Sequence, residues 1–534
     1  MSSSYYDVIA LGSQLGPLAA ASLLAKRGFR VLVLSQEALP PTYVINGHEL
    51  FREPFNFQYA FTPIAQKIFG ELGIRQEIRQ KTEVHPDGIQ LCLPKQRFVL
   101  SKDPDTFSKE IAREFPKVQT PIIDFARRTE ALCQELEAHL QTGLPWPPHD
   151  PKRLLAFLYH SHALARLHPS AMTDLMGEFS KDQPFVTAMR ALESHFVPSG
   201  NHSSLQLARV FDLSRHTIAF RGGLKALNDM LFARIRAQGG EIWESERAAS
   251  VITNGNHATG IRLHNSGQSI SAGTIIAGNS LGSVLQMVDD RRPFQKLLER
   301  TGEPRLQLAR YTLNLVVPRT HLPSALGRDT LVIHAPDQPL FDGSLLHIQR
   351  METRSTGTLE RDAESSRAQA TNDSSAESQP SHEVLCLQTT LGLRTLNENK
   401  TLLRALRPLL IKSAERVLPF LNDYILLADS PHDGLDPEDR RAGTTIPPRE
   451  PWNRGPHTMP LGWSFPVRPA LSLSAIPIRT PYRNLLVCNS QNVPGLADEG
   501  SLMAAWSTAE LVCKADTRRS WLRRGRWYSQ TYAD

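Results

Sequence analysis

Apolar and polar residues form blocks over the start of the chain, and each block has the length of one structural element. Val8 to Leu11 is an unbroken apolar run, which predicts a strand buried on both faces. Leu18 to Ala25 is a longer run of small and apolar residues that predicts a helix, and Gly28 ends it. Arg30 to Leu34 predicts a second strand. The opening segment is therefore expected to form a strand–helix–strand unit.

The turn between the first strand and the helix carries part of a glycine fingerprint. Dinucleotide-binding units have G-x-G-x-x-G there, so that the backbone approaches a pyrophosphate at the helix N-terminus. Gly12 is in place, but Gln14 and Pro17 stand at the second and third glycine positions. Ser35 stands where an acid would accept the ribose hydroxyls. Gln14 must therefore swing away or fill the site, whereas a proline in the first helical turn costs little.

A second block repeats the change from helical to strand periodicity. Apolar residues at helical spacing predict a helix over residues 224–238, which Gly239 and Gly240 end. Strand-like runs follow at 241–243, 248–253, 258–264, 268–271 and 274–277. The turn at 254–256 (Asn-Gly-Asn) predicts a hairpin. We expect the first and last runs to join the opening sheet in parallel, and the middle three to form a meander on its face.

A third block near the C-terminus has the same order as the first. Leu485 to Cys488 predicts a strand, and a loop with glycine and proline leads from it into a helix expected over Ser501 to Val512. This order again directs a helix N-terminus towards a ligand.

The rest of the chain predicts a second, mixed region. Helices are expected at 63–73 and 401–418, a hairpin at 89–100, and strands at 308–316 and 345–349. Residues 352–382 contain almost no large apolar side chain, so they predict a disordered surface insertion between neighbouring strands. A cluster of aromatic residues predicts packing in the core or between domains: Phe51, Phe55, Phe57, Tyr59 and Phe61.

Composition narrows the class of protein. The chain has 534 residues, of which 40% are apolar and 21% charged, as in globular proteins of more than one domain. Its net charge is +6, but lysine and arginine are scattered, so nucleic acid is not an expected partner. The five cysteines have no metal-ligand or disulfide spacing and favour a reducing, cytoplasmic compartment. The apolar stretch Val8 to Ala25 has no basic flank and is interrupted by glycine and proline, so no signal or membrane segment is expected there.

Sequence motifs of other enzyme classes are absent. The chain has no H-E-x-x-H, no G-x-S-x-G and no P-loop. His160 and His162 lie two apart in a helical region and do not share a face, so no metal site is expected there. For His216, close to residues 221–223, a structural or surface position is favoured over a place in the lining of the cleft. The sequence therefore identifies no catalytic residues.

The three blocks together resemble the superfamily of FAD-dependent amine oxidases and phytoene desaturases, especially its carotenoid desaturase and isomerase-like branch. The matching stretches include Arg221 to Leu224, Ala237 to Gly240, Ala258 to Leu263 and Asn484 to Leu486. The resemblance implies an α/β fold in which a Rossmann-like FAD/NAD(P)-binding domain with a β-meander is interleaved with an α+β substrate domain. The implied FAD-binding domain comprises 1–62, 205–290 and 470–515, and the implied substrate domain comprises 63–204 and 291–469, with a basic tail at 516–534.

The resemblance also implies a set of cofactor-binding positions. Gly12 and Ser13 match the turn that faces the pyrophosphate, and Glu499 to Ser501 match the loop that approaches the flavin. The superfamily's Ala-Gly-Asp/Ser after the last strand appears here as Cys488-Asn489-Ser490. The implied set is Gly12, Ser13, Gln14, Gly16, Ser35, Ala248, Gly278, Asn279, Ser490, Glu499, Gly500 and Ser501.

Two main functions follow from this resemblance, and a third is weaker. The first is an FAD-dependent oxidoreductase that transfers hydride between an apolar, polyene-like substrate and the flavin. The second is a degenerate member that has lost FAD and serves as a binding or assembly protein. An NAD(P)-dependent dehydrogenase is the third, but such an enzyme needs neither the meander nor the C-terminal glycine loop. Arginine and tryptophan in the tail suit a peripheral contact with an anionic membrane, or a solvated terminus.

Overall fold

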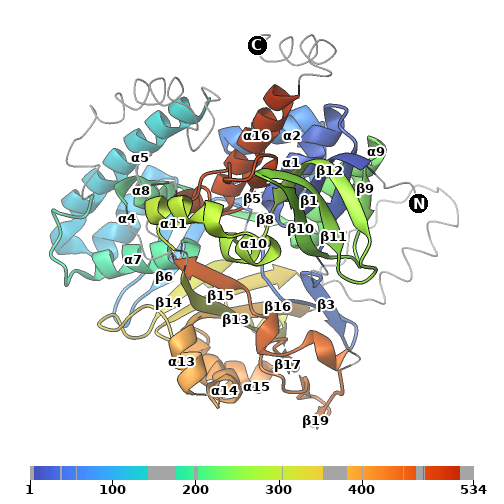
Figure 1. Cartoon of the computed structure of the whole chain (residues 1–534). Helices are drawn as coiled ribbons and strands as arrows, with labels where there is room; N and C mark the ends of the chain where they lie inside the picture. Colours follow the sequence, from blue (N-terminus) through green and yellow to red (C-terminus); the bar gives the residue numbers. More distant parts are fainter. Residues whose placement is uncertain are drawn as a thin grey trace, which may run out of the picture.

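Two large β-sheets, one of seven strands and one of ten, organise the chain (Figure 1). The structure of the chain is a computed structural model. The structure describes residues 5–36, 39–55, 57–141, 175–197, 203–303, 305–352, 382–399, 401–448, 450–464, 473 and 475–516. His160, His162, most of the 352–382 segment and the basic tail beyond residue 516 lie outside the described residues.

The seven-stranded sheet contains the predicted parallel strands in the order β21-β12-β1-β2-β9. These strands are β1 (Tyr5–Leu11), β2 (Val31–Leu34), β9 (Glu241–Trp243), β12 (Ser269–Ala277) and β21 (Leu485–Val487). The α/β fold with a Rossmann-like sheet is thus confirmed. The domain boundaries stay a prediction.

The meander differs from its prediction in one respect. The runs expected at 268–271 and 274–277 form a single strand, β12, because Ala272 and Gly273 between them continue the extended backbone. Strand β10 (Ala248–Asn254) pairs with β11 (His257–Leu263), and β11 pairs with the first half of β12, whose second half pairs with β21. The meander is therefore continuous with the sheet through β12. Its apolar residues share a core with Ile9 and Leu34, on the side of the parallel strands opposite α1, which confirms that the meander covers that face.

Helices α1 (Leu15–Lys26), α9 (Gly223–Ala237) and α16 (Ala497–Ala515) cover one side of this sheet (Figure 1). Every residue of α1 except its last is buried, because its alanines and glycine let it lie close to its neighbours. Helix α1 begins at Leu15, three residues before the predicted start at Leu18. Helix α16 begins at Ala497, four residues before the predicted start at Ser501. Pro17 is tolerated in the first turn of α1, where the missing N–H has no intrahelical partner.

The ten-stranded sheet has the order β19-β18-β17-β13-β16-β15-β14-β6-β7, with β20 beside β13. The predicted hairpin is β6 and β7, and the predicted insertion joins β15 to its antiparallel partner β16. Helices α13, α14 and α15 cover the outer face (Figure 1). The bounds are β6 (Asp87–Cys92), β7 (Arg97–Ser101), β13 (Arg305–Pro318), β14 (Asp329–Ile333), β15 (Leu345–Glu352), β16 (His382–Gly392), β17 (Leu427–Asp429), β18 (Glu438–Asp439), β19 (Thr444–Thr445), β20 (Leu461–Ser464), α13 (Leu393–Glu398), α14 (Leu402–Ala414) and α15 (Leu421–Tyr424).

The remaining described elements are mainly helices. Helix α2 ends at Gly73, as predicted, in the left-handed conformation (φ 71°). Phe57 is fully buried among Phe55, Tyr59, Phe69 and Phe220, which confirms core packing for most of the aromatic cluster, but the Phe61 side chain is exposed. These elements are α2 (Pro63–Leu72), α3 (Arg75–Lys81), α4 (Pro104–Glu114), α5 (Gln119–Gln141), α7 (Pro184–Phe196), α8 (Ser204–Leu213), α10 (Leu281–Met287), α11 (Gln295–Thr301), β3 (Thr42–Ile45), β4 (His48–Phe51), β5 (Thr82–His85) and β8 (Thr217–Phe220).

Candidate functional site

The turn between β1 and α1 lies where the carboxyl ends of three parallel strands meet. Gly12 has φ 103°, which favours glycine, and its N–H donates to the Leu34 carbonyl at the end of β2 (2.7 Å). The Gly278 N–H, just after β12, donates to the Leu11 carbonyl (2.8 Å). In sheets of this kind, ligands bind at such carboxyl ends. The structure thus brings Gly12 and Gly278 together, as the predicted site requires.

The Gln14 side chain folds back into this turn. A Cβ atom added to Gly12 would overlap Gln14 Oε1, and one added to Gly278 would lie 3.0 Å from the same oxygen. Gln14 is exposed and its side chain makes no capping hydrogen bond to α1. The space above Gly12 is therefore filled by the tip of a flexible side chain, and one rotation of that side chain would empty it.

Gly16 and Pro17 have packing roles. A Cβ on Gly16 would lie 3.0 Å from the Cys488 carbonyl oxygen, so glycine lets α1 approach the end of β21. The Pro17 ring lies against Gly278, where a Cβ would overlap it. Both residues hold the start of α1 against neighbouring strand ends.

A second glutamine, which the sequence analysis missed, contacts the predicted site at the end of β2. Ser35 is buried, and its N–H donates to the Trp243 carbonyl (3.1 Å). Gln36 follows with φ 60°, and its Oε1 accepts from the Ala248 N–H (3.2 Å). Its Nε2 is buried and has no hydrogen-bond partner among the described residues. Ala248 is a predicted cofactor-binding residue, and its N–H is thus occupied by the Gln36 side chain.

The segment after β21 is tied together by asparagines. Asn489 Nδ2 donates to the Asn279 carbonyl (2.7 Å), and Asn489 Oδ1 accepts from the Gln491 N–H (2.9 Å). Asn492 Oδ1 accepts in turn from the Asn489 N–H (2.9 Å). Ser490 is exposed at the tip of this turn. Asn489 therefore joins the ends of β21 and β12 as a turn residue.

The start of α16 is held by buried charge and close packing. The Glu499 carboxylate accepts two hydrogen bonds from Arg209 of α8, to Nε (2.8 Å) and to Nη2 (2.9 Å), and both residues are 1% exposed. Burial alone would lower the pKa of Arg209, but the charge and hydrogen bonds of Glu499, together with the contributions of Cys133 and Glu137, raise that pKa well above its usual value. A Cβ on Gly500 would overlap the Val493 carbonyl oxygen, and Ser501 is buried behind it. The predicted trio 499–501 thus forms a rigid, packed helix start.

Beside this helix start lie ionisable groups from separate segments, which no motif revealed. Burial and the nearby charge of Glu53 raise the pKa of Asp498 to about 6, whereas Arg310 acts to lower it. Burial also raises the pKa of Glu53, against the charge of Arg310. The Tyr59 hydroxyl is buried and has no partner among the described residues. Burial and the two carboxyl groups raise its pKa well above the usual value.

The inner face of the ten-stranded sheet adds a polar row. Thr312, Gln388 and His347 stand in register on β13, β16 and β15. His347 Nε2 lies 3.0 Å from Asp329 Oδ1, and its ring centroid lies 4.2 Å from that of His195 on α7. Burial, followed by the charges of His347 and Arg310, lowers the pKa of His195 well below its usual value.

His216 lies directly before β8. Burial lowers its pKa to about 4, and its carbonyl accepts a hydrogen bond from Gln58 Nε2 (3.1 Å). A neutral, partly buried histidine of this kind fits the expected structural role.

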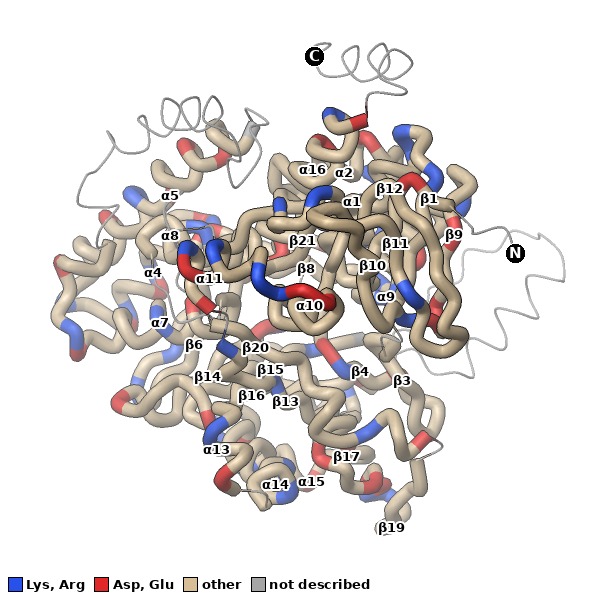
Figure 2. Tube along the Cα trace, in the orientation of Figure 1, with Lys and Arg blue, Asp and Glu red and all other residues tan. Residues whose placement is uncertain are grey.

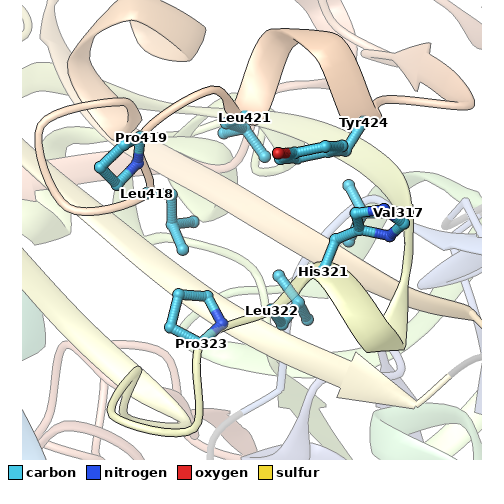
Figure 3. A pocket seen from close by; sticks show the side chains of 8 residues that line it. All are labelled: Val317, His321, Leu322, Pro323, Leu418, Pro419, Leu421 and Tyr424. Carbon is cyan, nitrogen blue, oxygen red and sulfur yellow. The ribbon is translucent and has the colours of Figure 1, made fainter.

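Other features of the described chain lie away from this region. A pocket of about 270 Å³ is lined by Leu322, Leu418, Tyr424 and their neighbours, next to the outer helix α15 (Figure 3). Basic and acidic positions are interspersed over the described elements (Figure 2). No helix in the described ranges has the length and apolarity needed to cross a membrane. Within the same ranges, no cluster of three or more metal-ligating side chains is found.

Comparison with known proteins identifies relatives over about half of the chain. No family model matches it. The prolycopene isomerase of Daucus carota is 26% identical over 314 residues, which cover 55% of this chain and 50% of the relative. The prolycopene isomerase of Arabidopsis thaliana is 25% identical over 322 residues, covering 55% of this chain and 52% of the relative. The chain spans about half the length of the curated relatives it matches.

Solved structures resemble the fold over nearly the whole chain. An oxidoreductase from Methanosarcina mazei superposes with a TM-score of 0.54 and 14% identity, over 94% of this chain and 99% of that one. A putrescine oxidase with bound putrescine gives a TM-score of 0.54 and 14% identity, over 95% and 99%. At this identity the likeness concerns the fold. Together with the two isomerases it confirms the predicted resemblance to the superfamily of FAD-dependent amine oxidases and phytoene desaturase-like proteins.

Proposed function

We propose that the chain is a flavin-dependent enzyme of the carotenoid isomerase and desaturase type, which acts on an apolar, polyene-like substrate. The observation that carries the proposal is the meeting of the ends of β12, β1 and β2 at Gly12, with the N-terminus of α1 above them. The similarity to two prolycopene isomerases supports the substrate class.

The residues present fit FAD once Gln14 has rotated. Gly12 and Ser13 would then face the pyrophosphate with their backbone, at the start of a helix whose partial positive charge favours an anion. FAD would supply the redox chemistry of the site. The chain's own residues would bind and orient: Gly12 allows the close approach, and the packed start of α16 gives a rigid wall. Ser35 could offer only a neutral hydrogen bond to the ribose, so we expect modest affinity.

The absorbance spectrum of the purified protein tests this proposal. We expect visible flavin absorbance, release of FAD on denaturation, and conversion of prolycopene by the FAD-loaded protein. Products separated by chromatography would distinguish isomerisation, which leaves the mass unchanged, from desaturation, which lowers it. Gly12→Trp should abolish flavin binding, because its side chain would fill the turn. Folded, colourless protein that takes up no added FAD would overturn the proposal.

One set of observations favours the alternative, a scaffold without FAD. Gln14 fills the turn above Gly12, Gln36 occupies the Ala248 N–H, and Ser35 replaces the acid. Three separate parts of the predicted cofactor site thus depart from the cofactor-binding pattern. Stoichiometric flavin in the purified protein would exclude this alternative.

The tail gives a separate proposal about location. Residues 516–534 combine arginine and tryptophan, which suits peripheral contact with an anionic membrane where an apolar substrate gathers. Sedimentation with vesicles containing phosphatidylserine should fall when the chain is truncated after residue 516. Equal sedimentation of both forms would contradict this contact.

A further inference from the structure

The end of β2 is tied by hydrogen bonds to the link between β9 and β10. The Ser35 N–H, directly after β2, donates to the Trp243 carbonyl at the end of β9 (3.1 Å). Gln36 Oε1 accepts from the Ala248 N–H at the start of β10 (3.2 Å). Both ends of the link 244–247 are therefore held against residues 35 and 36, where the superfamily pattern has its ribose-binding acid.

Hydrogen bonds from the meander fix the backbone of this link. Asn265 Nδ2 donates to the Ser245 carbonyl (3.1 Å), and the His264 N–H donates to the Arg247 carbonyl (2.9 Å). Glu246 lies between these two anchors. It also lies two residues before Ala248, which is a span of at most about 7 Å between their Cα atoms. Glu246 is thus a neighbour of the hydrogen bond between Gln36 and Ala248.

Two buried polar atoms of this region have complementary hydrogen-bonding roles and no partner. Gln36 Nε2 is a donor and Glu246 Oε2 is an acceptor, and neither has a hydrogen-bond partner among the described residues. The orientation of the Gln36 amide is set by the Ala248 N–H, which only the amide oxygen can accept. An unpaired buried carboxylate oxygen costs more than an unpaired neutral group. The fold therefore maintains a costly acceptor at the end of β2.

The backbone of Gln36 adds an independent cost. Its φ is 60°, a left-handed conformation that is unfavourable for a residue other than glycine. Such conformations cluster at binding and active sites. Both Gln36 and Glu246 are half-buried, so rotation of either side chain can bring its unpaired atom to the open end of the strands.

We propose that Glu246 supplies the acid that Ser35 lacks, and that Glu246 and Gln36 together bind the ribose of an adenine nucleotide. A ribose hydroxyl both donates and accepts hydrogen bonds. It would donate to Glu246 Oε2 and accept from Gln36 Nε2, while Gln36 Oε1 keeps its bond to the Ala248 N–H. This inference rests on the proposed function and names the residues that would hold the ribose of FAD.

A carboxylate at this place also defines the class of nucleotide. In dinucleotide-binding folds an acid beside the ribose accepts from its hydroxyls, whereas a 2′-phosphate is accommodated by an arginine. The negative charge of Glu246 would repel a 2′-phosphate. The expected ligands are therefore FAD and ADP, and 2′-phosphorylated nucleotides are excluded.

Titration of the flavin-free protein with ADP and with 2′,5′-ADP tests this assignment without any turnover. The wild type should bind ADP about tenfold or more tightly than 2′,5′-ADP in calorimetry. Glu246→Gln should weaken the binding of both ADP and FAD about tenfold and remove the preference for ADP. The matched control is Glu244→Gln, in the same link. Glu244 is an exposed acid paired with Arg236 (3.1 Å), so its loss should change neither affinity.

A rescue variant and a stability measurement separate binding from a structural role. Ser35→Asp, made in the Glu246→Gln background, returns an acid to the end of β2 and should restore tight ADP binding. Glu246→Gln alone should not lower the unfolding temperature of the flavin-free protein, because Oε2 has no partner to lose. A lower unfolding temperature with unchanged affinity for ADP would overturn the assignment and make Glu246 a structural residue.

The results for FAD separate this inference from the proposed function. If the wild type binds FAD and ADP, and Glu246→Gln binds both equally well, the inference fails and the proposed function stands. The inference also fails if the preference for ADP is removed by Glu37→Gln, which changes the acid that follows Gln36 in the sequence, and not by Glu246→Gln. If the wild type binds ADP but not FAD, the ribose site stands and the proposed function fails. A wild type that binds neither nucleotide overturns both.

Discussion

Helices α1 and α16 pack against each other, but their N-termini are built in opposite ways. The start of α1 departs from the superfamily pattern, and its space is filled by Gln14, an exposed side chain with no capping bond. The start of α16 matches the pattern, and it is locked by the ion pair of Glu499 and by the close approach of Gly500 to Val493. The helix start that matches the superfamily pattern is therefore rigidly packed, and the one that departs from it carries an adjustable side chain. The start of α16 is best tested by protein stability, and the start of α1 by cofactor affinity.

The largest effect is expected when the ion pair at the start of α16 is broken. Arg209→Met leaves the buried Glu499 carboxylate without its partner and should cost about 3–5 kcal/mol of unfolding free energy. Glu499→Gln should cost less, because Arg209 keeps Glu137 at 2.8 Å and Asp212 at 3.7 Å. Urea denaturation of both variants measures this difference. Equal losses would show that Glu137 and Asp212 do not compensate Arg209.

The next effect separates close packing from backbone strain. Gly500→Ala should cost about 2–4 kcal/mol, since its Cβ would overlap a backbone oxygen that cannot easily move. The matched control is Gly28→Ala, where φ is 83° and a Cβ meets nothing within 4 Å, so only strain of about 1–2 kcal/mol is expected. Thermal unfolding should rank the two variants in this order. A smaller loss for Gly500→Ala would mean that the start of α16 can shift.

The sequence predicted the scaffold better than the site. Apolar runs such as Val8 to Leu11 reveal strands because both faces are buried, and the positive φ of Gly12 follows from the turn that such a unit needs. The fusion of two runs into β12 was missed, because Gly273 resembles a break in the pattern although its backbone stays extended. Gln36 and Glu246 were missed for another reason. They lie 210 positions apart, and only the pairing of β2 with β9 brings their segments together.

The third test addresses Gln14, the adjustable side chain at the start of α1. Gln14→Gly empties the space above Gly12 and should tighten FAD binding about tenfold, which corresponds to about 1.4 kcal/mol. Gln14→Leu keeps the volume and should not tighten it. Isothermal titration of the flavin-free protein measures both affinities. Equal affinity of Gln14→Gly and the wild type would show that the glutamine already lies aside when FAD binds.

The smallest effect is expected at Gln36, the second adjustable group of the predicted cofactor site. Gln36→Gly relieves a positive φ of 60°, worth about 1–2 kcal/mol, and loses the hydrogen bond to the Ala248 N–H, worth about 1 kcal/mol. The two contributions nearly cancel, so the unfolding free energy should change by less than about 1 kcal/mol. Gln36→Ala keeps the strain and loses the bond, so it should be less stable than Gln36→Gly when both are unfolded in urea. If the alanine variant equals the wild type instead, the Gln36 side chain contributes nothing to the stability of this part of the predicted site, and Gln14 alone distinguishes the adjustable helix start from the rigid one.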